Sequence, residues 1–231
     1  MVDPGRRLVI AIDGPVGAGK STAARRLAAA LGYVYVDSGA MYRAFGWKAV
    51  RDRVGLQDRE RLAELAARTD IRILPSAAGP RVLVDGADVT DLLRTPRMDE
   101  ASSLVSVWPE VRERLVALQR SMARMGGVVM DGRDIGTVVL PDADLKFYLD
   151  ADPDVRAARR LRDLERTGVA ADLAAVRTEV LRRDTRDSSR AASPLHPAPD
   201  ALRVDSSRLD ADAVFALMLR EAAKRCRAHN S

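Results

Sequence analysis

One stretch near the N-terminus limits what this chain can fold into. The apolar run Leu8–Ile12 has the length and the β-branched content of a buried strand. Directly after it, the segment Gly14–Ser21 matches the pattern G-x-x-x-x-G-K-S, and strong helix formers fill residues 22–31. A glycine-rich loop between a buried strand and a helix is the arrangement that binds phosphate groups. The sequence therefore predicts a nucleotide site near the start of an α/β fold.

The glycines, the lysine and the serine of this loop each have an expected role in binding a nucleotide and its metal ion. Gly14, Gly17 and Gly19 allow the backbone to curl so that its N–H groups point at an anion. Lys20 is expected to reach the β- and γ-phosphates, and the Ser21 hydroxyl is expected to ligate Mg²⁺. A chance glycine-rich turn is the alternative, and the strand–loop–helix context argues against it. The residues expected to bind ATP are Gly14, Pro15, Val16, Gly17, Ala18, Gly19, Lys20, Ser21 and Thr22.

Composition excludes several classes of protein. A chain of 231 residues with 47% hydrophobic and 31% charged residues can form one substantial core with a small insertion. The apolar runs are too short to span a bilayer, and the first strand begins too early to leave room for a signal peptide. The single cysteine, Cys226, and the distant histidines His196 and His229 argue against a disulfide and against a zinc site. We therefore expect a cytoplasmic protein.

The charge balance favours anionic ligands. The formal net charge is +5, which suits phosphorylated small molecules and nucleic acids alike. Aromatic residues make up only 4% of the chain, and no pattern of stacking platforms for bases is present. A small phosphorylated ligand explains the charge at least as well as a nucleic acid does.

Strand and helix patterns alternate along the rest of the chain, with a change of periodicity in the middle. Ligands of such α/β sheets bind at the carboxyl ends of the strands. The inserted strand-like runs, joined by the Asp85-Gly86 turn signal, predict a small antiparallel sheet. Predicted core strands cover residues 33–36, 128–130, 145–149 and 202–204, inserted strands 71–74, 81–84 and 87–90, and helices 40–51, 58–69, 96–107, 110–125, 153–167, 172–187 and 210–227.

Polar residues follow two of these strands. After strand 33–36, Ser38 could donate to an anion or could simply cap the next helix, and the residues alone leave both readings open. Arg43, in that helix, could bind a phosphate in bidentate fashion. Asp131 ends strand 128–130, where a carboxylate that organises Mg²⁺ is expected, and Arg133 and Asp134 follow in the loop that we predict after this strand.

An arginine-rich helix pair occupies residues 156–190. Exposed arginines usually form a solvated helix face. Here Arg159 and Arg160 come one turn after Arg156, so that two guanidinium groups share a face. The spacing of Arg183, Asp187 and Arg190 likewise places these three on one face near a helix end. Because phosphoryl transfer is assisted by arginines from mobile segments, we interpret the pair as a lid.

Four segments together resemble the cytidylate kinases, a family of nucleoside monophosphate kinases. They are residues 12–21, 37–43, 131–139 and 183–190, and the match covers nearly the whole chain. The first segment alone is shared by many nucleotide-binding proteins, whereas the other three in this order are far more selective. The insertion of about forty residues between the second and third core strands is a further mark of the family.

The resemblance implies a fold and a reaction. The fold is the P-loop NTPase fold, a five-stranded parallel sheet with helices on both faces. Residues 1–39, 111–154 and 173–231 would form the core, residues 40–110 a monophosphate-binding domain and residues 155–172 a lid. The reaction is ATP + (d)CMP → ADP + (d)CDP with Mg²⁺ and without a general base, because the acceptor phosphate is already largely ionised. The expected protein is a monomer without nucleic-acid or membrane partners.

The resemblance also implies roles for single residues. Arg43, Arg133 and Arg112 look like a phosphate clamp, and Ser103 with Arg112 looks like a contact to the cytosine base. Arg183 and Asp187 look like sugar contacts. The full set expected around CMP is Ser38, Arg43, Ser103, Arg112, Arg133, Asp134, Arg183, Asp187 and Arg190. The residues expected to act in catalysis are Lys20, Arg133, Arg159, Arg160 and Arg190, of which Arg159 and Arg160 would reach ATP from the lid.

Two other classes of function remain open on the sequence alone. The first is another small-molecule kinase with the same core, acting on UMP, AMP or shikimate. The second is a non-catalytic nucleotide-binding or RNA-binding protein that uses its basic surface. Turnover of monophosphates would separate them, because an RNA-binding protein would show steeply salt-dependent binding and no turnover.

Overall fold

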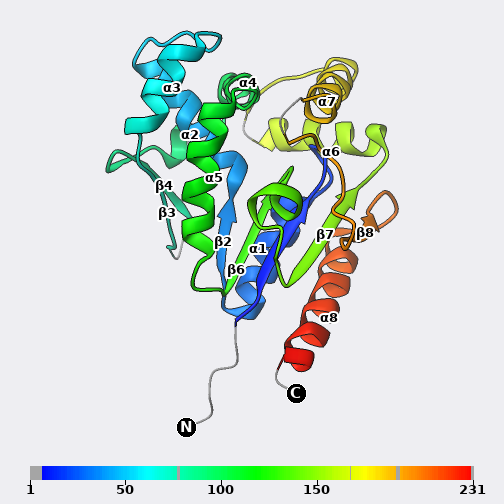
Figure 1. The fold of residues 1–231 in the computed structure, drawn as a ribbon. Coiled ribbons are helices and arrows are strands. Elements are labelled where there is room, and N and C mark those ends of the chain that lie inside the picture. Colours follow the sequence, from blue (N-terminus) through cyan, green and yellow to red (C-terminus); the bar gives the residue numbers. More distant parts are fainter. Residues whose placement is uncertain (1–6, 77–78, 167, 191–192, 230–231) are drawn as a thin grey trace. The chain divides into compact units, whose positions relative to one another are not determined.

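A computed structural model describes residues 7–76, 79–166, 168–190 and 193–229 (Figure 1). The chain divides into two compact units. The first, the core unit, comprises Met1–Tyr33 and Gly126–Ser231, and the second, the inserted unit, comprises Val34–Met125. No helix in the described part of the chain is long and apolar enough to cross a membrane.

The main sheet confirms the predicted α/β architecture. Its five parallel strands have the order β2-β6-β1-β7-β8. Ile10 in the central strand lies opposite Val129 on one side and Leu145 on the other, and it is fully buried. A strand flanked and covered in this way needs apolar residues on both faces, which explains the continuous apolar run in the sequence. The strands are β1 (Val9–Asp13), β2 (Val34–Asp37), β6 (Val128–Gly132), β7 (Leu145–Asp150) and β8 (Leu202–Asp205).

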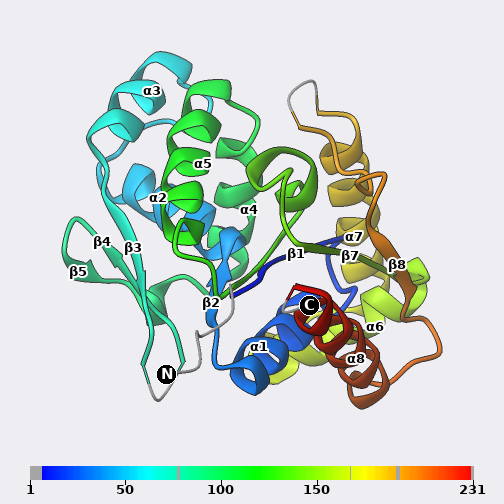
Figure 2. The same ribbon diagram turned by 60° about the horizontal axis from the view of Figure 1, so that its bottom comes forward.

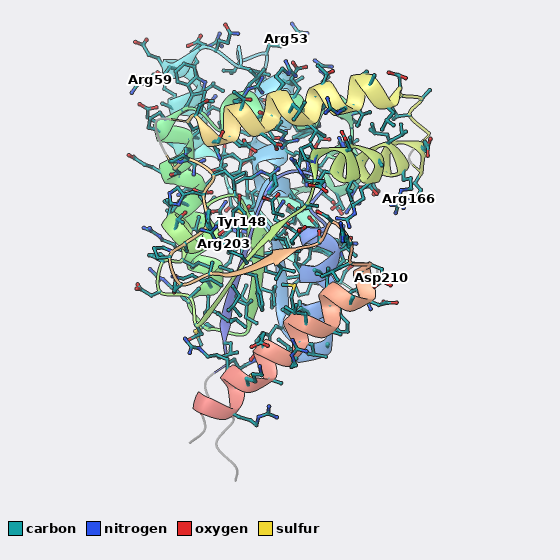
Figure 3. The ribbon with its side chains drawn as sticks, turned by 90° about the vertical axis from the view of Figure 1, so that its right-hand side faces the viewer. Arg53, Arg59, Tyr148, Arg166, Arg203 and Asp210 are labelled. Atoms are coloured by element: carbon teal, nitrogen blue, oxygen red, sulfur yellow. The ribbon has the colours of Figure 1, made fainter. Side chains whose placement is uncertain are left out.

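Among the residues that the structure describes, the core unit contains four α-helices. The helix after the phosphate-binding loop packs against the C-terminal helix (Figure 2). The arginine-rich pair forms a helical hairpin around an apolar cluster of Ala157, Leu164, Val176 and Val180. In the sheet beside this hairpin, Tyr148 of β7 lies opposite Arg203 of β8 (Figure 3). The four helices are α1 (Lys20–Leu31), α6 (Pro153–Arg166), α7 (Leu173–Ser188) and α8 (Ala211–His229).

A π-helical turn, η2 (Ile135–Val139), replaces the loop that the sequence predicts after β6. Its N–H groups bond five residues back, from Val139 to the carbonyl of Asp134 and from Leu140 to that of Ile135. This pattern is rare and is found mostly at functional sites. Nothing in the local hydrophobic periodicity indicates it, so it is a correction to the predicted loop.

The inserted unit contains the predicted small sheet. Its three antiparallel strands have the order β3-β4-β5, and Asp85, with a φ of 50°, lies in the tight turn between the last two. Helices α2 and α4 pack closely, because a Cβ added to Gly46 would lie only 2.9 Å from the Cβ of Ala101. The elements are α2 (Ser38–Arg51), α3 (Arg59–Arg68), β3 (Ile71–Leu74), β4 (Arg81–Val84), β5 (Ala87–Asp88), η1 (Thr90–Leu92), α4 (Pro96–Val105) and α5 (Pro109–Ala123).

Candidate active site

The phosphate-binding loop requires its glycines for two reasons. Gly14, Gly17 and Gly19 have φ angles of 145°, 77° and 91°, which side chains rarely adopt. A Cβ on Gly14 would also lie 1.9 Å from the carbonyl oxygen of Leu149, and one on Gly17 would lie 2.7 Å from that of Arg156. The loop therefore runs against the backbone of β7 and α6, and its conformation is available to glycine alone.

Lys20 is the first residue of α1, and its side chain is buried against the loop. Its Nζ donates to the carbonyl oxygen of Pro15 at 2.7 Å. Burial lowers the pKa of Lys20 to about 7, the charge of Arg133 adds to the effect, and Asp131 and Asp13 oppose it. No acidic residue lies in the first turn of α1, so this described helix end keeps its positive dipole for an anion.

Ser21 and Asp131, predicted together as the magnesium site, are in contact. The Ser21 hydroxyl donates to Oδ2 of Asp131 at 2.8 Å, and Asp131 is buried at the end of β6. Hydroxyl and carboxylate oxygens suit Mg²⁺, which usually takes one or two protein carboxylates and completes its shell with phosphates and water. Within the described residues, no group of three or more His, Cys, Asp or Glu could hold a metal. The oxygen atoms of Ser21 and Asp131 are nevertheless of the kind that suits a magnesium ion.

Asp13 is a buried charged residue that the sequence analysis did not single out. It lies at the carboxyl end of β1, directly before the loop. Its two carboxylate oxygens accept the backbone N–H groups of Ile135 and Gly136, each at 2.7 Å. Burial raises the pKa of Asp13 to about 6, although these two hydrogen bonds pull it down. The only signal in the sequence is an acidic residue that ends an otherwise apolar strand.

Three residues expected around CMP form an ionic network in the core unit. Nε of Arg133 donates to Asp187 at 2.7 Å, and Nη2 of Arg190 lies 3.8 Å from the other carboxylate oxygen of Asp187. Burial alone would raise the pKa of Asp187, but the charges of Arg133, Arg190 and Arg183 outweigh it and hold the pKa below its usual value. Helix α7 ends at Ser188, so Arg190 follows the helix rather than lying on its face as predicted.

Two of the residues expected around CMP, Ser38 and Arg43, lie in the first half of α2. Asp37 caps this helix, since its Oδ1 accepts the N–H of Ala40 at 2.8 Å. The capping reading of Ser38 is therefore wrong: Ser38 is the first, buried residue of the helix, which begins two residues earlier than predicted. The guanidinium of Arg43 lies 2.9 Å from Asp37 and 3.7 Å from Asp99 of α4. Two carboxylates thus hold this arginine in place.

Ser103 and Arg112 are both buried and are linked through one residue. The Ser106 hydroxyl donates to the carbonyl oxygen of Ser103 at 3.0 Å, and Arg112 donates to the carbonyl oxygen of Ser106 at 3.4 Å. The guanidinium of Arg112 also lies 5.8 Å from the ring centre of Tyr42, within the range of a cation–π contact. The structure therefore brings the two expected base contacts together in the inserted unit.

The arginines of α6 have different environments. Arg156 is buried and structural: it bonds the carbonyl oxygens of Ala151 and Val16 and pairs with Asp184 at 2.6 Å. The sequence predicted a face shared by at least two of these arginines but gave no sign that Arg156 is buried. Arg160 is half-buried on the same helix.

Arg159 contacts the segment that follows β8. It donates to the hydroxyl of Ser206 at 2.9 Å and to the carbonyl oxygen of Ser206 at 2.7 Å. The Ser206 hydroxyl in turn donates to the carbonyl oxygen of Ala18 at 3.1 Å. Ser206, which sequence reasoning missed, therefore joins the base of the hairpin to the phosphate-binding loop.

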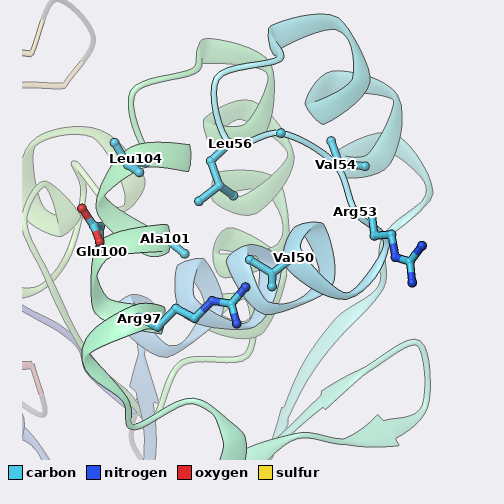
Figure 4. A pocket seen from close by; sticks show the side chains of 9 residues that line it. Val50, Arg53, Val54, Leu56, Arg97, Glu100, Ala101 and Leu104 are labelled. Atoms are coloured by element: carbon cyan, nitrogen blue, oxygen red, sulfur yellow. The ribbon is translucent and has the colours of Figure 1, made fainter.

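A cavity of about 410 Å³ lies in the inserted unit, between the end of α2, the segment after it and α4 (Figure 4). Arg97 and Val50 extend toward each other across it, whereas Arg53 points outward. None of the residues that line this cavity belongs to the set predicted from the sequence.

Comparison with known proteins identifies the family of this chain. The family model described as cytidylate kinase matches residues 10–224, a span that contains every site residue predicted from the sequence. The chain belongs to the cytidylate kinase family. The cytidylate kinase of Desulfitobacterium hafniense is 51% identical over 209 residues, with 90% of each chain covered. That of Pelotomaculum thermopropionicum is also 51% identical, over 91% of this chain and 93% of the relative.

The similarity to solved structures is much weaker. A putative kinase from Chloroflexus aurantiacus has a TM-score of 0.45 and 15% identity over 96% of this chain and 99% of that one. Such a similarity supports no argument about function. The family assignment therefore rests on sequence, and the site geometry rests on the residues described above.

Proposed function

We propose that this cytidylate kinase transfers the γ-phosphoryl group of ATP directly to CMP or dCMP in pyrimidine nucleotide metabolism. The observation on which the proposal rests is the family match over residues 10–224, at about half identity to named cytidylate kinases. A kinase for UMP, AMP or shikimate and a non-catalytic binding protein both lack such support.

ATP would bind through the loop Gly14–Ser21 and the N-terminus of α1. The inward backbone N–H groups and the helix dipole favour the phosphates. Lys20 would leave the carbonyl oxygen of Pro15 for the β- and γ-phosphates and be fully protonated there. Ser21 and Asp131 would hold a magnesium ion, which would neutralise part of the phosphate charge.

The residues proposed to bind CMP are those that the family resemblance implies. Ser38, Arg43, Ser103 and Arg112 come from the inserted unit, while Arg133, Asp134, Arg183, Asp187 and Arg190 come from the core unit. In the structure, Asp187 is paired with Arg133 and Arg190. We infer that the acceptor phosphate takes over these two arginines and that Asp187 is then available to the sugar hydroxyl groups.

Catalysis would depend on alignment and on charge neutralisation. The acceptor is a phosphate oxygen that is largely ionised at neutral pH, so no side chain has to remove a proton. Lys20, Arg133 and Arg190, with Arg159 and Arg160 from the hairpin, would neutralise charge on the transferring group. The hairpin α6–α7 would act as the lid, with Arg159 exchanging its contact to Ser206 for ATP. The expected setting is a monomer in the cytoplasm.

The acceptor assignment is tested by Arg190→Ala. Loss of a charged hydrogen bond to phosphate costs about 1.5–3 kcal/mol, or about a 10- to 100-fold rise in the KM for CMP. The KM for ATP should change less than about twofold. The matched control is Arg182→Ala, at an exposed arginine of α7 that belongs to no predicted site, and it should change neither constant. Equal losses for CMP and ATP would remove Arg190 from the acceptor site.

A further inference from the structure

The buried carboxylate of Asp13 joins two segments that carry different halves of the site. Asp13 immediately precedes the loop Gly14–Ser21, but its side chain bonds the turn η2, which follows Arg133 and Asp134. Both of its oxygens are used, one by the N–H of Ile135 and the other by that of Gly136.

We propose that Asp13 is a positioning residue for the acceptor nucleotide: its carboxylate fixes the backbone of Ile135 and Gly136 and thereby sets the positions of Arg133 and Asp134. This inference deepens the proposed function and rests on it, because it assigns Arg133 and Asp134 to CMP. Asp13 itself does not touch the substrate. It acts through the two backbone hydrogen bonds.

The need for this anchor follows from the geometry of η2. The first N–H groups of any helical turn have no partner within the turn and must be satisfied elsewhere. Those of Ile135 and Gly136 are buried, where an unpaired donor is costly. A carboxylate with an oxygen for each donor satisfies both at once, and it does so at 2.7 Å, the short distance typical of charge-assisted bonds.

The packing of Gly136 is a second, independent observation. A Cβ added there would lie 3.3 Å from Oδ2 of Asp13 and 3.1 Å from Cδ of Lys146. The φ of Gly136 is not positive, so its lack of a side chain is explained by space rather than by backbone conformation. The turn is thus held close to Asp13 on one side and bounded by the stem of Lys146 on the other.

The competing reading is that Asp13 merely supports the strand that leads into the phosphate-binding loop. The two interpretations differ in which substrate should bind less well when Asp13 is substituted. Support of the loop predicts a loss of ATP binding, whereas an anchor for η2 predicts a loss of CMP binding. The contacts favour the second reading, because both hydrogen bonds of the carboxylate end on residues that follow Asp134.

The test is Asp13→Asn, which keeps the shape of the side chain. The amide oxygen can accept one N–H, but the amide NH₂ faces the other donor and cannot accept it. We expect the dissociation constant of CMP, measured by calorimetry, to rise at least tenfold. That of a non-hydrolysable ATP analogue should rise much less, because only the charge that Asp13 contributes near Lys20 is lost on the ATP side. Hydrogen exchange at the amides of Ile135 and Gly136 should become faster.

Asp144→Asn is the matched control. Asp144 is also a buried aspartate that accepts a backbone N–H at 2.7 Å, from Val9, at the opposite end of β1. Its substitution should lower thermal stability but leave CMP binding and the exchange of Ile135 and Gly136 within twofold of the wild-type values.

Several outcomes would overturn the inference. Asp13→Asn could weaken ATP and CMP binding equally, or it could leave CMP binding and amide exchange unchanged. If Asp13→Asn does not fold, Gly136→Ala perturbs the same contact from the other side and must show the same selective loss of CMP binding. A wild-type protein that neither binds nor phosphorylates CMP would contradict the proposed function instead, while the exchange of Ile135 and Gly136 would still test the anchor.

Discussion

Two alanine substitutions in the phosphate-binding loop should have very different effects on stability. Gly14 and Gly19 both have positive φ angles, 145° and 91°, so alanine is strained at each by about 1–2 kcal/mol. At Gly14 the position of a new Cβ is also occupied, because it would lie 1.9 Å from the carbonyl oxygen of Leu149. At Gly19 a new Cβ would have no atom within 4 Å. Displacing the backbone of a central strand adds about 1–3 kcal/mol.

We therefore expect Gly14→Ala to lower the free energy of unfolding by about 2–5 kcal/mol and Gly19→Ala by about 1–2 kcal/mol. Urea denaturation without nucleotide measures both, with circular dichroism as the signal. For a chain of this size, the larger loss corresponds to a fall in Tm of about 2–4 °C per kcal/mol. Equal destabilisation by the two substitutions would refute the close contact between the loop and β7.

The other predictions concern the chemistry of the loop. Lys20→Ala should lower kcat by about 10²- to 10³-fold while the urea midpoint is retained, and a near-normal kcat would remove Lys20 from the reaction. Because the pKa of Lys20 is lowered to about 7, the lysine is charged below that pH and loses its proton above it. Affinity for an ATP analogue should therefore fall about tenfold per pH unit above about pH 7, and binding at pH 8 should take up a proton. Calorimetry in two buffers of different protonation enthalpy would detect this proton uptake. If the wild-type protein took up no proton, or if Lys20→Ala still took one up, Lys20 would not be the residue that is protonated on binding. Ser21→Ala should raise the Mg²⁺ concentration needed for half-maximal activity, since Asp131 loses the hydroxyl beside it; an unchanged magnesium titration would argue against a metal at this pair.

Local patterns were sufficient to predict most of the fold. The apolar run before Gly14, the Asp85-Gly86 turn and the periodicity of the helices each depend on neighbours in sequence, and the strands and helices were found near their predicted positions. The helix after β2 shows the limit of such reasoning. Asp37 and Ser38 are both good capping residues, and only the structure shows that Asp37 caps it.

Features that depend on distant partners were not predicted. The π-helical turn after β6 is anchored by Asp13, more than a hundred residues earlier in the chain. The spacing of the α6 arginines indicated a shared face but could not show that Arg156 is buried against Val16 and Asp184. Likewise, no pattern in the sequence connects Arg159 with Ser206. The identity and spacing of side chains suggest which residues belong to the site. Which residues they contact by hydrogen bonds and ion pairs can be seen only in the folded structure.

The most direct test of the proposed activity compares acceptors at fixed ATP and Mg²⁺. Initial rates of ADP formation with CMP, dCMP, UMP, AMP and shikimate give kcat/KM for each acceptor. Both CMP and dCMP should exceed the others by at least about tenfold, the discrimination that one or two specific hydrogen bonds to the base can supply. A higher kcat/KM for UMP or AMP than for CMP, or no turnover of any acceptor, would contradict the account.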